Sequence, residues 1–151
     1  MSLEEQLTVS GYMVLAAVLS MIIGLDRERR DKPAGLRTHM LVGVGACLFT
    51  ALSYLAFPDA DSSRVAANVV TGIGFLGAGV IYQSKDRVHD LTTAASIWLA
   101  AAIGMIVGVG AWLLALIATA FVWFILDILW RFRHRLEESE KIDMSKTRKN
   151  R

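Results

Sequence analysis

A short segment between residues 24 and 39 gathers the side chains that are best suited to chemistry in this chain. It reads Gly-Leu-Asp-Arg-Glu-Arg-Arg-Asp-Lys-Pro-Ala-Gly-Leu-Arg-Thr-His. Its carboxylates can pair with neighbouring cations, and the guanidinium of Arg37 can present a fixed fork of donors to a carboxylate or a phosphate. We call the following residues the polar collar: Asp26, Arg27, Glu28, Lys32, Arg37, Thr38 and His39.

Two interpretations of the polar collar stay open at the level of sequence. It could be an ion-paired ring that orients two helices at the level of lipid headgroups, or a site for a ligand or a partner. His39 alone is weak evidence for a metal site, so no metal is assigned. The sequence contains no HExxH motif, no nucleophile elbow and no cluster of metal ligands, so no catalytic residue or cofactor is predicted and an enzyme is the least favoured class.

Further polar residues lie inside or at the edges of long apolar stretches. Polar groups at membrane depth are costly, and each of them therefore deserves a functional hypothesis. Asp127 stands four residues before Arg131, a helical spacing that favours an ion pair over a proton-carrying role. The candidate intramembrane polar residues are Asn68, Thr71, Thr92, Thr93 and Asp127.

Glycines are concentrated in one apolar stretch, where Gly72-Ile-Gly-Phe-Leu-Gly77 matches GxGxxG by letter. That fingerprint has meaning only between a strand and a helix of a soluble βαβ unit, so a dinucleotide site is rejected. Close helix packing is the favoured interpretation, and a deformable helix at a transport site is the alternative. The predicted packing residues are Gly72, Gly74, Gly77, Gly79, Gly104 and Gly108.

These residues must be positioned by membrane helices. The chain has 151 residues, of which 54% are hydrophobic, and its mean hydropathy is +0.47. A membrane helix needs roughly 20 apolar residues. Five such stretches predict an all-α, polytopic membrane bundle with spans near 7–25, 38–57, 65–82, 91–107 and 111–130. Residues 1–130 would form the transmembrane domain, and residues 131–151 a basic, partly disordered cytoplasmic tail.

The charge distribution predicts how this bundle is oriented. Fifteen of the sixteen Lys and Arg residues fall in three blocks, at residues 27–37, 85–87 and 131–151, and only Arg64 lies elsewhere. Five spans place all three blocks on one side of the membrane. Because cytoplasmic loops are enriched in Lys and Arg, we expect the N-terminus outside and the C-terminus inside.

Four motifs resemble the hallmark segments of the MgtC/SapB family. They are Gly24-Leu-Asp-Arg-Glu, Lys32-Pro-Ala-Gly-Leu-Arg-Thr-His39, Gly72-Ile-Gly-Phe-Leu-Gly-Ala-Gly-Val-Ile81 and Leu91-Thr-Thr-Ala-Ala-Ser-Ile-Trp98, in the family's order and spacing. Two departures limit the resemblance. Many members continue into a soluble C-terminal domain, which we do not expect here, and Asp90 stands where the family usually has Gly.

The resemblance implies a multi-pass protein of the bacterial inner membrane that is linked to growth in low magnesium and, in pathogens, to virulence and survival in macrophages. It implies a non-enzymatic modulator of other membrane machinery, including the ATP synthase. The alternative is a transporter or channel for Mg²⁺ or another cation. The expected partners are the lipid bilayer, other membrane proteins and, as a further option, a second copy of the chain. Nucleic acid is not expected.

Overall fold

The protein is a bundle of antiparallel helices, as the sequence predicts. The structure, a computed structural model, describes residues 1–57, 61–84, 87–128 and 131. Within them lie α1 (Leu3–Arg29), α2 (Leu36–Ala56), α3 (Ser63–Val80), α4 (Leu91–Gly108) and a fifth helix, Trp112–Ile128. The first four are long and apolar enough to cross a membrane. A two-stranded hairpin that the sequence did not predict, β1 (Tyr82–Ser84) with β2 (Arg87–His89), separates α3 from α4.

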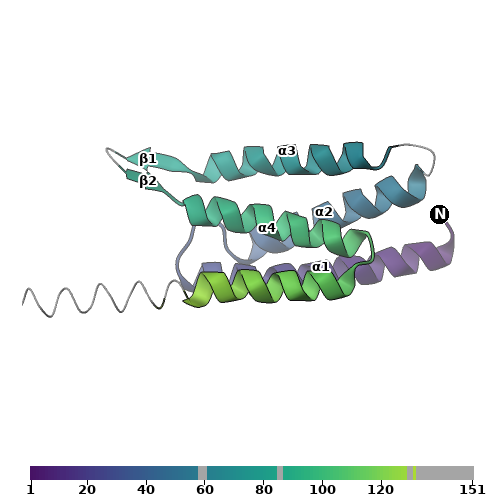
Figure 1. Ribbon diagram of the computed structural model, residues 1–151, viewed down its shortest axis with the longest axis horizontal. Coiled ribbons are helices and arrows are strands. Elements are labelled where there is room, and N and C mark those ends of the chain that lie inside the picture. The colour runs from purple at the N-terminus through teal and green to yellow at the C-terminus, as the bar shows by residue number, and fades with distance from the viewer. Residues whose placement is uncertain (58–60, 85–86, 129–130, 132–151) are drawn as a thin grey trace, which may run out of the picture.

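Successive helices run in opposite directions, so the bundle has two distinct ends (Figure 1). The end of α1, the start of α2, the hairpin and the end of the fifth helix lie together at what we call the basic end. The start of α1 and the ends of α2 and α4 lie at the opposite end, which we call the acidic end after Glu4 and Glu5. This arrangement agrees with five alternating spans. Which end faces the cytoplasm remains a prediction.

α1 is longer than the sequence suggested. Ser2 and Glu5 form a capping box at its start, and the helix continues to Arg29 instead of ending before Asp26. Ion pairs formed by Asp26 with Arg27 and Arg30 stabilise the added turn. The chain turns only after Arg30, where Asp31 adopts a left-handed backbone with φ of 51°. The first residues of the polar collar therefore belong to a helix and not to a link.

The centre of the bundle is a close contact between the backbones of α2 and α4. A Cβ atom on Gly104 would lie 2.1 Å from the Gly43 carbonyl oxygen, and one on Gly108 would lie 2.7 Å from the Cys47 carbonyl oxygen. Larger apolar side chains of α1, α4 and the fifth helix pack around this contact: Leu19, Ile23, Ile103, Val107 and Val122. The small residues of α2 and α4 thus serve packing within the chain, as helix association in lipid requires.

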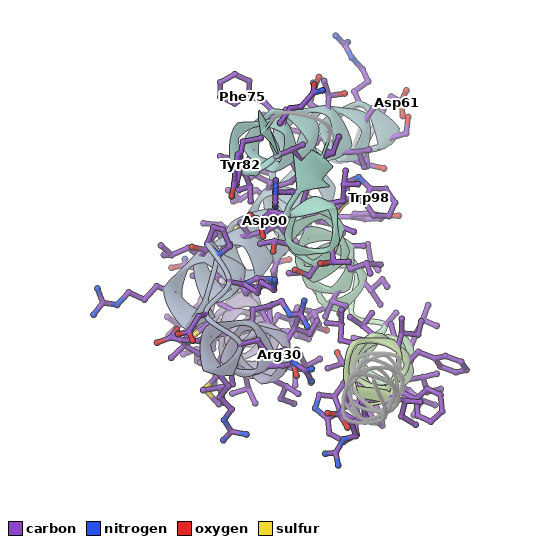
Figure 2. The ribbon with its side chains drawn as sticks, turned by 90° about the vertical axis from the view of Figure 1, so that its left-hand side faces the viewer. Arg30, Asp61, Phe75, Tyr82, Asp90 and Trp98 are labelled. Carbon is purple, nitrogen blue, oxygen red and sulfur yellow. The ribbon has the colours of Figure 1, made fainter. Side chains whose placement is uncertain are left out.

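α3 lies at the edge of the bundle, packed mainly against α4 (Figure 1). Gly77 is its one buried residue, and a Cβ atom there would lie 3.6 Å from the Ala94 side chain. Figure 2 shows Phe75 pointing away from the bundle, and its side chain is 82% exposed. α3 therefore presents most of its surface to whatever surrounds the protein.

The connections around α3 and α4 use residues with unusual backbone angles. Asp90, which stands where the family usually has Gly, has φ of 61° and is the N-cap of α4 after the hairpin. The rings of Tyr82 and His89 stack across the hairpin with centroids 4.8 Å apart. Gly110, with φ of 82°, forms the tight turn that reverses the chain between α4 and the fifth helix.

Candidate functional site

The polar collar lies at the basic end, and its centre is the carboxylate of Asp26. This carboxylate accepts hydrogen bonds from Arg27 Nε at 3.0 Å and from Arg30 Nε at 2.8 Å. Arg27 is 3% exposed, so its buried positive charge is compensated by the neighbouring carboxylate of Asp26. A buried charge is tolerated when it is paired and hydrogen-bonded. Asp26 and Arg27 therefore act as a structural pair.

Arg30 extends this pair to the fifth helix. Its Nη2 atom donates to Asp127 Oδ1 at 3.1 Å, and Arg131 Nε donates to Asp127 Oδ2 at 2.8 Å. Arg30 lies between α1 and the fifth helix in Figure 2. The predicted pairing of Asp127 with Arg131 is present, but the link to α1 was missed. Arg30 lies four residues after Asp26, and this helical spacing is the sequence signal that could have assigned Arg30 to the polar collar.

Glu28 shapes the start of α2 from outside that helix. Gly35 precedes α2 and offers no side-chain cap, so the backbone N–H of Leu36 donates instead to Glu28 Oε2 at 2.7 Å. A Cβ atom on Gly35 would lie 2.7 Å from the same oxygen. The Pro-Ala-Gly bend thus brings an acidic side chain of α1 to the positive end of the α2 dipole, which favours negative charge there.

His39 is a fully buried imidazole that joins α2 to α4. Its Nδ1 atom lies 2.9 Å from the Gly35 carbonyl oxygen, and its Nε2 atom lies 3.0 Å from Ser96 Oγ. A carbonyl oxygen only accepts, so Nδ1 carries the proton. The Ser96 hydroxyl also lies 2.8 Å from the Thr93 carbonyl oxygen. His39 and Ser96 are 57 residues apart, and nothing in the sequence pointed to this bond.

The remaining collar residues face outward. Arg37 is exposed, and Lys32 and Thr38 are partly exposed. Within the described part of the chain, none of the three side chains makes an ion pair or a hydrogen bond. The structure therefore divides the collar into a paired inner part, which holds helices together, and an outer part that is accessible to other molecules.

The candidate intramembrane polar residues do not come together. Thr93 is buried in the first turn of α4, whereas Thr92 in the same turn is exposed. Asp127 belongs to the basic-end ion pairs. Asn68 and Thr71 lie on the exposed surface of α3, where the Thr71 hydroxyl donates to the Ala67 carbonyl oxygen at 2.9 Å. The structure therefore shows no polar cluster at mid-membrane among these residues.

The glycines of α3 differ from those of α4. Gly104 and Gly108 are in close backbone contact with α2, as described above. In contrast, among the described residues outside α3 itself, no atom lies within 4 Å of a Cβ atom added to Gly72, Gly74 or Gly79. Close helix packing was the prediction for all of these glycines. The peripheral position of α3 explains why these three make no such contact with the other described helices.

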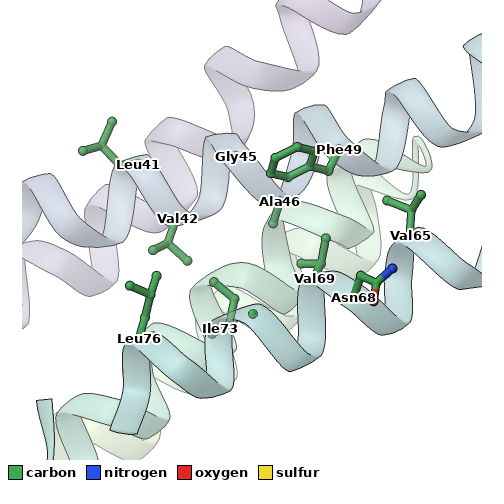
Figure 3. Close-up of a pocket in the computed structure, with 11 residues that line it drawn as sticks. Leu41, Val42, Gly45, Ala46, Phe49, Val65, Asn68, Val69, Ile73 and Leu76 are labelled. Carbon is green, nitrogen blue, oxygen red and sulfur yellow. The ribbon is translucent and has the colours of Figure 1, made fainter. Parts of the chain in front are cut away.

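A groove of about 500 Å³ separates the exposed part of α3 from α2 (Figure 3). Its lining is apolar apart from Asn68. Gly45, Leu41 and Phe49 line it from α2, and Gly72 and Leu76 line it from α3. The described residues contain no group of three or more His, Cys, Asp or Glu side chains that could hold a metal ion.

Five apolar antiparallel helices with an ion-paired basic end define a multi-pass membrane protein of the all-α class. The chain belongs to the MgtC family, whose model matches residues 13–135.

Three relatives illustrate the similarity. The putative magnesium transporter YhiD of Escherichia coli K12 is 42% identical over 82% of this chain and 61% of its own length. Protein MgtC of Brucella abortus is 46% identical over 71% of this chain and 45% of its own length. Protein SrpB of Synechococcus elongatus is 40% identical over 78% of this chain and 72% of its own length. The chain thus spans about three fifths of YhiD and under half of that MgtC. No solved structure matches.

Proposed function

We propose that this chain is a non-enzymatic modulator of other membrane proteins that acts in adaptation to low magnesium. Its membership of the MgtC family supports the connection with magnesium. The observation that carries the proposal is the exposed surface of α3, where an added Cβ atom on any of three glycines would meet no other element among the described residues.

Glycine within a helix is less favourable than alanine by about 1 kcal/mol per residue. This cost applies to Gly72, Gly74 and Gly79. Among the described residues, no close contact requires a glycine at these three positions. In lipid, helices associate by bringing their backbones together over small residues. A transmembrane helix of another protein could approach closely over these glycines. Such a contact would explain why small residues occupy this exposed surface.

The outer part of the polar collar supports the same function at the basic end. Arg37 is exposed, and its guanidinium is suited to a carboxylate on a partner's loop. The inner part is engaged in holding α1, α2 and the fifth helix together. The family resemblance makes the ATP synthase one candidate partner, and localisation in the bacterial inner membrane follows from the same resemblance.

Photo-crosslinking in bacterial membranes tests the proposal. A crosslinking amino acid at Phe75 should give a discrete adduct with another membrane protein, and Gly74→Leu should abolish it. The same amino acid at Leu113, which is 57% exposed on the fifth helix, is the matched control and should give none. Adducts with lipid alone, or only with a second copy of the chain, would contradict a modulator of other proteins.

Cation transport is the second candidate, because the Escherichia coli relative is named a putative magnesium transporter. Magnesium flux into proteoliposomes of the purified chain, compared with empty liposomes, distinguishes the two. Glu28→Ala would not identify a residue of the ion pathway, because Glu28 caps α2 and its removal would also disturb that helix. Asn68→Ala is better, because Asn68 lines the groove beside α3 and makes no internal hydrogen bond among the described residues. Magnesium flux that is lost in Asn68→Ala would contradict the modulator proposal and support a transporter.

A further inference from the structure

A cavity of about 430 Å³ opens at the acidic end, and its lining includes no residue of the polar collar and none of the candidate intramembrane polar residues. The first turns of α1 and the last turns of α2 and α4 form its walls. Polar and aromatic side chains gather in it: Glu4, Glu5, Thr8, Tyr12 and Tyr54. It is therefore chemically unlike the apolar groove beside α3.

The charges around this cavity favour a cation. Glu5 is engaged in the capping box, where its Oε2 accepts from the Ser2 backbone N–H at 2.7 Å and lies 4.0 Å from the Met1 ammonium group. Glu4 is exposed, and its carboxylate accepts no hydrogen bond from the described residues. The last turns of α2 and α4 add the negative ends of two helix dipoles, each equivalent to about half an electronic charge. The lining contains no Lys or Arg.

The aromatic lining favours an organic cation over a bare metal ion. Tyr12 and Tyr54 line the cavity, and ammonium groups are attracted to the faces of aromatic rings. Mg²⁺, in contrast, prefers an octahedron of oxygen ligands and retained water. Tyr54 and Val109 also line a second cavity, of about 340 Å³, whose lining is mainly apolar. A charged group and an apolar chain on one molecule could thus occupy neighbouring spaces.

We infer that the cavity at the acidic end binds a primary ammonium group. An aminophospholipid headgroup and a free polyamine share this chemistry. In either case, the ammonium group is held by the Glu4 carboxylate and by the rings of Tyr12 and Tyr54. This site is independent of the proposed contact between α3 and a partner helix.

Native mass spectrometry of the full chain in detergent tests the inference, with phosphatidylethanolamine, phosphatidylglycerol, putrescine or magnesium chloride added separately. The chain should retain phosphatidylethanolamine over phosphatidylglycerol, or else bind putrescine, and these two results identify the source of the ammonium group. Glu4→Gln should lower the retained fraction about threefold, the effect of one exposed charge. Asp31→Asn, an equal charge change at the basic end, should leave it unchanged.

A ring variant separates aromatic contact from general acidity. Tyr54→Leu should lower retention about threefold, whereas Tyr54→Phe, which keeps the ring, should not. Equal retention of the two lipids without binding of putrescine would overturn the inference, as would retention that is insensitive to Glu4→Gln. Binding of magnesium alone would overturn it as well.

Discussion

Arg30 and Asp127 are separated by 97 residues in sequence, and their side chains meet at 3.1 Å where α1 approaches the fifth helix. Both side chains are largely withdrawn from solvent, with 10% and 15% exposed. This contact anchors the fifth helix to the first at the basic end. It also ties Asp127 to the polar collar, which sequence spacing alone could not do.

Removing this contact should loosen the fifth helix. Asp127→Ala would leave the partly buried guanidinium of Arg30 without that carboxylate, and we expect a loss of about 1–3 kcal/mol in the free energy of unfolding. Thermal unfolding in detergent measures it. Arg131→Ala is the control, because Arg131 is 69% exposed and should cost about 0.5 kcal/mol or less. Equal losses in the two variants would contradict the anchoring role.

Adding one methyl group should have opposite effects on two glycines. Gly104→Ala places a Cβ atom 2.1 Å from the Gly43 carbonyl oxygen and must separate α2 from α4, so we expect a loss of about 2–4 kcal/mol. Gly72→Ala meets open space and gains helix propensity, so we expect about 0.5–1 kcal/mol of added stability. The two variants are compared by thermal unfolding in the same detergent. A destabilised Gly72→Ala in the monomer would contradict the open space beside Gly72.

The cap supplied by Glu28 should be visible in the first turn of α2. Glu28→Ala removes the acceptor of the Leu36 N–H, and losing a helix cap costs about 1 kcal/mol. We expect faster amide hydrogen exchange at residues 36–38, with little change near the middle of α2. Asp31→Asn, a neighbouring change of charge, should leave this exchange unaltered. Unchanged exchange in Glu28→Ala would mean that water replaces the carboxylate without cost.

His39 and Ser96 should be energetically coupled. His39→Phe and Ser96→Ala each break the contact between Nε2 and Oγ, so the double variant should cost less than the sum of the two single ones. A coupling of about 0.5–3 kcal/mol is typical of side chains in direct contact. The coupling is obtained from the free energies of unfolding of the unmodified protein, the two single variants and the double variant. Additive losses would show that the two side chains stabilise the bundle separately.

The orientation can be tested by fusing alkaline phosphatase at two points. A fusion after the fifth helix should be inactive, because the positive-inside rule places the basic end in the cytoplasm. A fusion after Phe57, at the acidic end, should be active. The reverse pattern would invert the bundle in the membrane and would leave its internal contacts unchanged.

The helices were predictable because long apolar stretches and breaks such as Pro33 are local features of the sequence. The hairpin was not, since β1 and β2 are three residues each, too short to show a period. The division of the glycines also could not be predicted. Gly72 and Gly104 look alike in sequence, and only the placement of α3 at the edge distinguishes them. The predicted tail after residue 131 lies outside the described residues.

The contact between Gly43 and Gly104 has a consequence for the passage of ions. Where two backbones touch, no space is left for a water molecule, and still less for a hydrated ion. The seam between α2 and α4 is therefore closed to permeation, and it runs through the centre of the bundle. The groove between α3 and α2, in contrast, leaves space between two helices, so a route along that groove is compatible with the closed seam.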